Sequence, residues 1–171
     1  MLNMAEKTTI LAIDPGNIES GFALISMPDF ELLDFGKVGN ETFLQNLPFL
    51  AGQSDSFAIE MVASYGMPVG KDVFETCVWI GRFVQAAKKE AYFVYRKDEK
   101  LCLCGSLKAK DSNIRQALID RYATFDFKNG KGTKKNPDTF YGVSKDAWQA
   151  IAVGVTHYEK EREQNGETDP K

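Results

Sequence analysis

Three acidic residues are the groups in this sequence best suited to chemistry, because each lies at the end of an otherwise apolar stretch. Asp14 ends ILAID, Glu60 ends FAIE, and Asp146 opens the apolar run DAWQAIAVGV. A charge in apolar surroundings costs free energy unless something pairs with it. Three carboxylates brought together repel one another, and a divalent cation that takes hard oxygen ligands, such as Mg²⁺, relieves that repulsion. The sequence therefore predicts a metal-dependent acidic cluster.

A cluster of this kind suits the hydrolysis of a phosphodiester. Two Mg²⁺ or Mn²⁺ ions about 4 Å apart stabilise both the attacking and the leaving oxygen of an in-line displacement. Water is then the nucleophile, the 3′ oxygen is the leaving group, and no covalent intermediate is needed. A single Asp at a strand end is more often a turn former, so the prediction depends on all three acids together.

The elements that must position these acids follow from the pattern of apolar residues. Short β-rich runs predict five strands, over residues 8–13, 20–26, 30–38, 57–60 and 91–96. Helical spacing predicts four helices, over residues 40–50, 71–89, 110–123 and 143–161. The second and third strands are expected to form a hairpin. The resulting order β-β-β-α-β-α-β-α-α indicates an α/β protein with a mixed sheet.

The predicted elements give each acid a position. Asp14 ends the first strand at a Pro-Gly turn, and Glu60 ends the fourth strand. If these two strands are neighbours, both carboxylates lie at one edge of the sheet. Asp146 lies in the first turn of the last helix, whose apolar residues would pack the helix onto the sheet and bring this third acid to the other two.

Length and composition fit one domain of ordinary size. The chain has 171 residues, 43% of them hydrophobic, and no apolar run approaches the roughly 20 residues of a membrane span. The N-terminus lacks the apolar core of a signal peptide, so we expect a cytoplasmic protein.

The cysteines Cys102 and Cys104 would share one face of a strand and pack in the core. With one His and no CxxC, a structural zinc site is not expected.

The overall charge of −3 conceals a strong asymmetry along the chain. Residues 1–81 have a net charge of −8, residues 82–135 of +8, and residues 136–171 of −3. A local basic patch can bind a polyanion even when the whole protein is acidic. The basic middle of the chain therefore allows a nucleic-acid partner, although a solvated mixed surface would give the same charges.

Three segments together resemble the RuvC-type Holliday junction resolvases. ILAIDPGNIESGFALI resembles the opening of that family, FAIEMV its second acidic motif, and KDAWQAIAVGVTH its last motif. The resemblance covers roughly residues 8–160, and departures elsewhere look more like a bacteriophage member. It implies an RNase H-like nuclease domain over residues 1–162, followed by a polar tail at 163–171. It also implies a homodimer that cuts paired strands at four-way DNA junctions with Mg²⁺, in the host cytoplasm if the protein is phage-encoded.

Carried over by position, the resemblance makes Asp14, Glu60 and Asp146 catalytic metal ligands. The family has a fourth ligand one helical turn before the last Asp, and that position here is Val143. Asp138, in the preceding loop, or a water molecule could replace it. An Asp in such a loop more often shapes the loop, and that interpretation of Asp138 is favoured over the ligand role.

Candidate DNA contacts lie in the basic middle of the chain. Tyr65, two residues beyond the family's aromatic wedge position, could stack on an unpaired base or be an ordinary loop Tyr. The family's basic residues have approximate matches in Lys97 or Lys100 and in Lys108 or Lys110. A Gly- and Lys-rich loop over residues 126–139 is expected to be flexible and to order on backbone phosphates, or to be a solvated disordered loop. Its lysines are Lys128, Lys131, Lys134 and Lys135.

The predicted helix over residues 71–89 has more apolar surface than one sheet face needs. It is the candidate dimer contact, unless its own domain covers it on both sides. Two other functions are open. One is another RNase H-like nuclease that uses the same acids to cut flaps or RNA–DNA hybrids. The other is a non-catalytic junction-binding protein whose site has decayed, which the missing ligand at Val143 would allow. A phosphotransferase of the actin and sugar-kinase type would need a longer, two-lobed chain.

Overall fold

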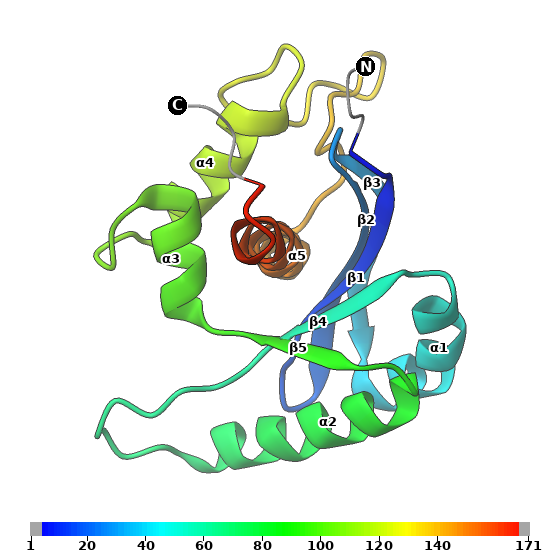
Figure 1. The fold of residues 1–171 in the computed structure, drawn as a ribbon, viewed down its shortest axis with the longest axis vertical. Helices are drawn as coiled ribbons and strands as arrows, with labels where there is room; N and C mark the ends of the chain where they lie inside the picture. Colours follow the sequence, from blue (N-terminus) through cyan, green and yellow to red (C-terminus); the bar gives the residue numbers. More distant parts are fainter. Residues whose placement is uncertain (1–4, 168–171) are drawn as a thin grey trace.

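The computed structural model describes residues 5–167, which fold into a five-stranded mixed sheet with helices on both faces (Figure 1). The strands are β1 (Thr8–Asp14), β2 (Glu19–Met27), β3 (Glu31–Gly39), β4 (Ser56–Glu60) and β5 (Ala91–Val94). The helices are α1 (Asn40–Gly52), α2 (Lys71–Ala87), α3 (Arg96–Cys104), α4 (Asp111–Tyr122) and α5 (Lys145–Gln164). The predicted α/β class with a mixed sheet is confirmed.

The sheet has the order β3-β2-β1-β4-β5. β1, β2 and β3 form the predicted antiparallel meander, and β4 and β5 add to the other side in parallel. β1 is thus the central strand and β4 is its neighbour, as the placement of the acids required.

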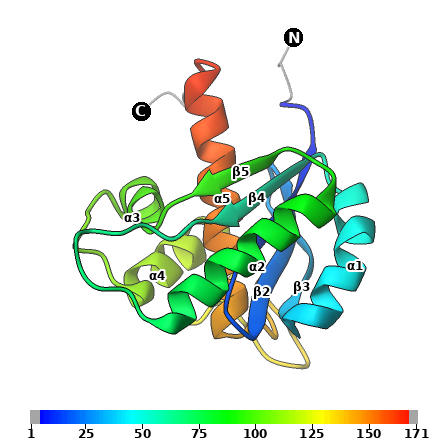
Figure 2. The ribbon, with the colours of Figure 1, turned by 90° about the horizontal axis from the view of Figure 1, so that it is seen from below.

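Two hydrophobic cores lie on opposite faces of this sheet. One packs α5, with α3 and α4 beyond it, onto the sheet, and the other packs α1 and α2 (Figures 1 and 2). Because successive strand residues point to opposite faces, Ala12 of β1 belongs to the α5 core and Ile13 to the α1–α2 core. α5 lies close against the sheet because Gly154 has no side chain: a Cβ there would lie 2.9 Å from Ile25 and 3.1 Å from Ala12.

The structure corrects the prediction after the fifth strand. β5 ends at Val94, and Arg96 begins α3, a helix that the sequence analysis did not predict. Cys102 and Cys104 therefore lie on a helix and not on a strand, although both do pack against the core. The aromatic and branched residues of YFVYR favour a strand, whereas the charged run that follows resembles a solvated loop when its burial is not known.

α5 continues to Gln164, beyond the start of the predicted tail at residue 163, and residues 168–171 lie outside the described part of the chain. Among the helices formed by residues 5–167, none is both long and apolar enough to cross a membrane.

Candidate active site

Asp14 and Glu60 lie side by side at the end of two adjacent parallel strands. Ile13 of β1 pairs with Ile59 of β4, so the next residue of each strand is an acid. Both acids follow an alanine by two residues, and those alanines belong to the core beneath α5. The period of two along a strand therefore turns both carboxyl groups toward α5.

Asp146 reaches the same place because of a glycine. Gly21 of β2 is the residue paired with Asp14 across the antiparallel ladder. A Cβ at Gly21 would lie 2.4 Å from the backbone oxygen of Asp146 and 3.1 Å from its Cβ. Only glycine lets the first turn of α5 come so close to the sheet beside Asp14. The structure thus brings the three predicted acids to one end of β1, β4 and α5.

A lysine lies on the next strand, β3, beside Asp146. Lys37 of β3 pairs with Gly21, and its Nζ is 3.0 Å from Asp146 Oδ2 and 3.2 Å from Glu19 Oε2. These hydrogen bonds to Asp146 and Glu19 raise the pKa of Lys37. Lys37 therefore stays charged and holds the Asp146 carboxylate in place.

The acids perturb one another's ionisation. Burial, then the neighbouring charges of Glu60 and Asp146, raises the pKa of Asp14 to about 8. Burial also raises the pKa of Glu60, although Arg96 opposes this. Glu60 Oε2 is buried and has no hydrogen-bond partner among residues 5–167. The site therefore has an excess of negative charge that its own hydrogen bonds do not satisfy.

Sequence reasoning missed two residues of this site, Arg96 and Glu99. Arg96 lies 4.0 Å from Glu60 Oε2 and donates to Glu99 Oε1 at 3.3 Å. It also hydrogen-bonds Asp111 of α4 and Gln149 of α5. Glu99 is fully buried, and burial, then the charge of Glu60, raises its pKa to about 9. The available signal was spacing: Glu99 lies four residues before the buried Leu103, on the inner face of α3.

The donor chemistry fits a hard divalent cation. Carboxylate oxygens are the ligands that Mg²⁺ and Mn²⁺ take, and Glu60 Oε2 accepts no hydrogen bond in the described chain, although Arg96 lies 4.0 Å from it. In the described part of the chain no three His, Cys, Asp or Glu side chains converge closely enough to hold an ion. Arg96 and Lys37 instead occupy the positions beside Glu60 and Asp146. Closure on an ion would require these cations to move aside.

Asp138 is placed elsewhere, which corrects its prediction as a fourth ligand. Its two oxygens accept hydrogen bonds from four backbone N–H groups, those of Thr124, Phe125, Asp126 and Thr139. Burial of the carboxyl opposes ionisation, but these N–H bonds together lower its pKa. Asp138 is therefore the residue that shapes the loop, and Val143 is buried in the core.

Some predicted DNA contacts gather beside the acids and others do not. Tyr65, Lys97 and Lys100 line a groove of about 280 Å³ together with Arg96 and Leu107. Lys108 and Lys110 are exposed on the segment that leads into α4, outside the residues lining this groove.

The loop over residues 126–139 is better ordered than its composition suggests. Besides the bonds to Asp138, Asp126 accepts hydrogen bonds from the N–H groups of Asn129, Lys131 and Gly132. Lys128 and Lys131 line a cavity of about 410 Å³ against α4. Lys134 and Lys135 are exposed. These bonds give the backbone of the loop a defined conformation, and its ordering on DNA stays a prediction.

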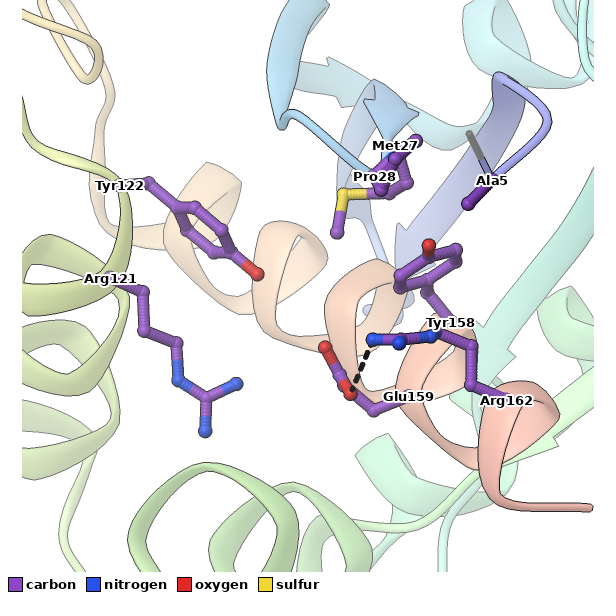
Figure 3. Close-up of a pocket in the computed structure, with 8 residues that line it drawn as sticks. All are labelled: Ala5, Met27, Pro28, Arg121, Tyr122, Tyr158, Glu159 and Arg162. Carbon is purple, nitrogen blue, oxygen red and sulfur yellow. Dashed lines mark ion pairs between the residues drawn. The ribbon is translucent and has the colours of Figure 1, made fainter. Parts of the chain in front are cut away.

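A separate cavity of about 700 Å³ lies near the other end of α5 (Figure 3). Tyr158, Glu159 and Arg162 line it from the helix, and an ion pair of 3.9 Å joins the last two. Tyr158 follows Asp146 by twelve positions along the helix, a rise of about 18 Å. This cavity is therefore not part of the acidic site.

Comparison with solved structures finds several that share this fold, and two of them match nearly the whole chain. One is Thermus thermophilus RuvC in complex with a Holliday junction substrate, with a TM-score of 0.68, 16% identity, and coverage of 96% of this chain and 99% of that chain. The other is Thermus thermophilus RuvC, with a TM-score of 0.62, 15% identity, and coverage of 95% and 99%. Searches of family models and of curated proteins give no match. The predicted RuvC-type, RNase H-like fold is thus confirmed by structure.

Proposed function

We propose that this protein is a structure-selective endonuclease that resolves four-way DNA junctions by hydrolysing phosphodiester bonds in paired strands. One observation supports this most: in a fold shared with RuvC, Asp14, Glu60 and Asp146 come together at one end of the sheet. One of the two RuvC structures contains a Holliday junction. At 15–16% identity the likeness extends to the fold, so the substrate and the reaction are proposed for this chain.

The three predicted acids would hold Mg²⁺ or Mn²⁺, proposed as two ions per site. When bound, the ions would neutralise charge on the phosphate and on the attacking and leaving oxygens. Because burial and the neighbouring acids raise the pKa of Asp14 to about 8, binding of an ion by its carboxylate would release a proton near neutral pH. Lys37 orients Asp146 and lies at the exposed margin of the site, where it can contact a phosphate oxygen.

The groove beside Arg96 is the proposed path of a DNA strand away from the site. Lys97 and Lys100 offer charges to the backbone, and Tyr65 offers an exposed ring for a base. Lysines farther along would contact the junction arms through their phosphates. They are Lys108, Lys110, Lys128, Lys131, Lys134 and Lys135.

A homodimer is proposed with α2 at its contact. The inner face of α2 packs Ile80 and Phe83 into the core, whereas Phe74 and Val78 on its outer face are 61% and 64% exposed. A dimer with two-fold symmetry would match the approximate two-fold symmetry of a four-way junction. Sedimentation of a monomer at micromolar concentration would exclude this interface.

The proposed function is tested with a panel of labelled substrates. We expect paired, symmetric nicks in a synthetic four-way junction with Mg²⁺, and none with EDTA. Preferred cutting of flaps or RNA–DNA hybrids would instead indicate another RNase H-like nuclease. Tight junction binding without cleavage in any divalent metal would favour a non-catalytic binding protein, an alternative kept open because Arg96 lies beside Glu60. Phage origin and a cytoplasmic location stay predictions.

A further inference from the structure

Glu99 is the most deeply buried acidic side chain near the site, and no residue role described above uses it. It lies on α3 with none of its surface exposed. An ionised carboxylate in such a place needs a partner for each oxygen. Oε1 accepts a hydrogen bond from Arg96, whereas Oε2 has no partner within residues 5–167.

Glu99 is joined to one of the three predicted acids, Glu60, through one guanidinium nitrogen. Arg96 Nη1 lies 3.3 Å from Glu99 Oε1 and 4.0 Å from Glu60 Oε2. Glu60 also has an oxygen without a hydrogen-bond partner in the described chain. Two acids that each have one oxygen without a hydrogen bond in the described chain thus share one cation.

Arg96 is well placed to move without leaving its neighbours. It also bonds Gln149, one turn after Asp146 on α5, and Asp111 at the start of α4. Asp111 is largely exposed, so a guanidinium turned outward would remain paired. Arg96 can therefore keep Asp111 as a partner if an ion occupies the position beside Glu60 and Glu99.

We infer that Glu99 is a fourth carboxylate of the acidic site and that Arg96 is its built-in counter-ion, which a divalent cation displaces. The inference rests on the proposed function, because it assumes that the site takes such a cation. It also accounts for Val143: the acid missing from the start of α5 is supplied from α3. Arg96 then sets the affinity for the ion, because the ion must compete with a charge already present.

The test measures Mn²⁺ binding to the protein alone, by calorimetry and by electron paramagnetic resonance, at pH 8. Arg96→Met should bind Mn²⁺ about 10-fold more tightly than wild type, and Mn²⁺ should raise its melting temperature more. Adding Glu99→Gln to that variant should remove most of the gain, since loss of a ligand or its support costs roughly 10- to 100-fold. The control is Arg82→Met, which removes an arginine paired with Glu41 on the opposite face of the sheet.

The inference is overturned if Arg96→Met binds Mn²⁺ no more tightly than wild type, or if Glu99→Gln leaves its affinity unchanged. Should Arg96→Met not fold, Glu99→Gln alone decides: about 10-fold weaker binding supports the inference, and unchanged binding overturns it. Absence of Mn²⁺ binding to the wild type also overturns it. A wild type that binds Mn²⁺ as expected but cuts no junction refutes the proposed function and leaves the role of Glu99 standing.

Discussion

The acidic end of the sheet and the basic loop over residues 126–139 are built in opposite ways. In the first, strand register and one glycine force charged side chains together, and one Glu60 oxygen is left without a hydrogen bond in the described chain. In the second, Asp126 and Asp138 satisfy the backbone of the loop, and the lysine side chains stay exposed. The acidic end holds unfavourable charge that an ion would relieve, whereas the loop is stable by itself and presents charge outward. Changes to the first should abolish chemistry, and changes to the second should weaken binding.

The largest effect is expected from Asp14→Asn. The substitution removes a carboxylate from the centre of the cluster while keeping its shape, so junction cleavage in Mg²⁺ should fall by at least about 1,000-fold. Junction binding in Ca²⁺ or EDTA should stay within about threefold of wild type, because no basic residue is touched. Gel-based cleavage and binding assays measure both. Cleavage at the wild-type rate would refute the catalytic role of the cluster.

Gly21→Ala should have the next largest effect, because the added methyl group meets the backbone of Asp146 at 2.4 Å. We expect cleavage to fall about 100-fold as α5 moves away from Asp14, together with a loss of about 1–3 kcal/mol in unfolding free energy from overpacking. Gly39→Ala is the matched control, since a Cβ there would find open space within the described chain. If both variants cleave equally well, the close approach of α5 does not matter for catalysis.

These two positions show what the sequence could and could not reveal. The sequence alone identifies the three acids Asp14, Glu60 and Asp146, because each is a charged residue at the end of an apolar run. Their meeting depended on the first and fourth strands being neighbours, and the structure fulfils that condition. Glu99 had only the weak signal of its spacing to Leu103, since it lies in a charged run, RKDEK, and the packing of α3 against α4 and α5 buries it. The role of Asp138 was ambiguous for a related reason. The four backbone N–H groups that donate hydrogen bonds to it come from two separate stretches of the chain, which the sequence does not show to be neighbours.

Metal binding at the acidic end of the sheet should depend on pH, because it involves the ionisation of Asp14. With a pKa of about 8, Asp14 must lose a proton to bind an ion, so Mn²⁺ affinity should rise about 10-fold per pH unit up to pH 8. Without metal, the raised pKa has the opposite effect: the native state holds this proton above the unfolded pKa, so stability should fall from about pH 4 to pH 8. Asp14→Asn should remove the contribution of this proton to the pH dependence of Mn²⁺ affinity and to that of stability. Calorimetry and thermal melts across pH in EDTA test it.

In the loop, Asp138→Asn should cost stability without abolishing chemistry. An amide NH₂ replaces an oxygen that accepted hydrogen bonds from backbone N–H groups, so the free energy of unfolding should fall by about 2 kcal/mol. The folded-state pKa of Asp138 is lowered, so its stabilisation is present above the unfolded pKa and is lost as the pH falls below it. Junction affinity should drop about fivefold, with cleavage of bound junctions unchanged. Asp120→Asn, on the surface of α4, is the charge-matched control; an equal loss of stability there would contradict the role of Asp138.

The smallest effect is expected from replacing the two exposed lysines at the tip of the loop. Lys134→Ala with Lys135→Ala removes two charges while leaving the bonds made by Asp126 and Asp138 intact. If both lysines contact phosphate, junction affinity should fall a few-fold, and the slope of log affinity against log salt should decrease by about 2. Melting temperature and the cleavage rate at saturating protein should not change. An unchanged salt slope would mean that the loop is a solvated surface, and the proposed DNA path would then end at the groove beside Arg96.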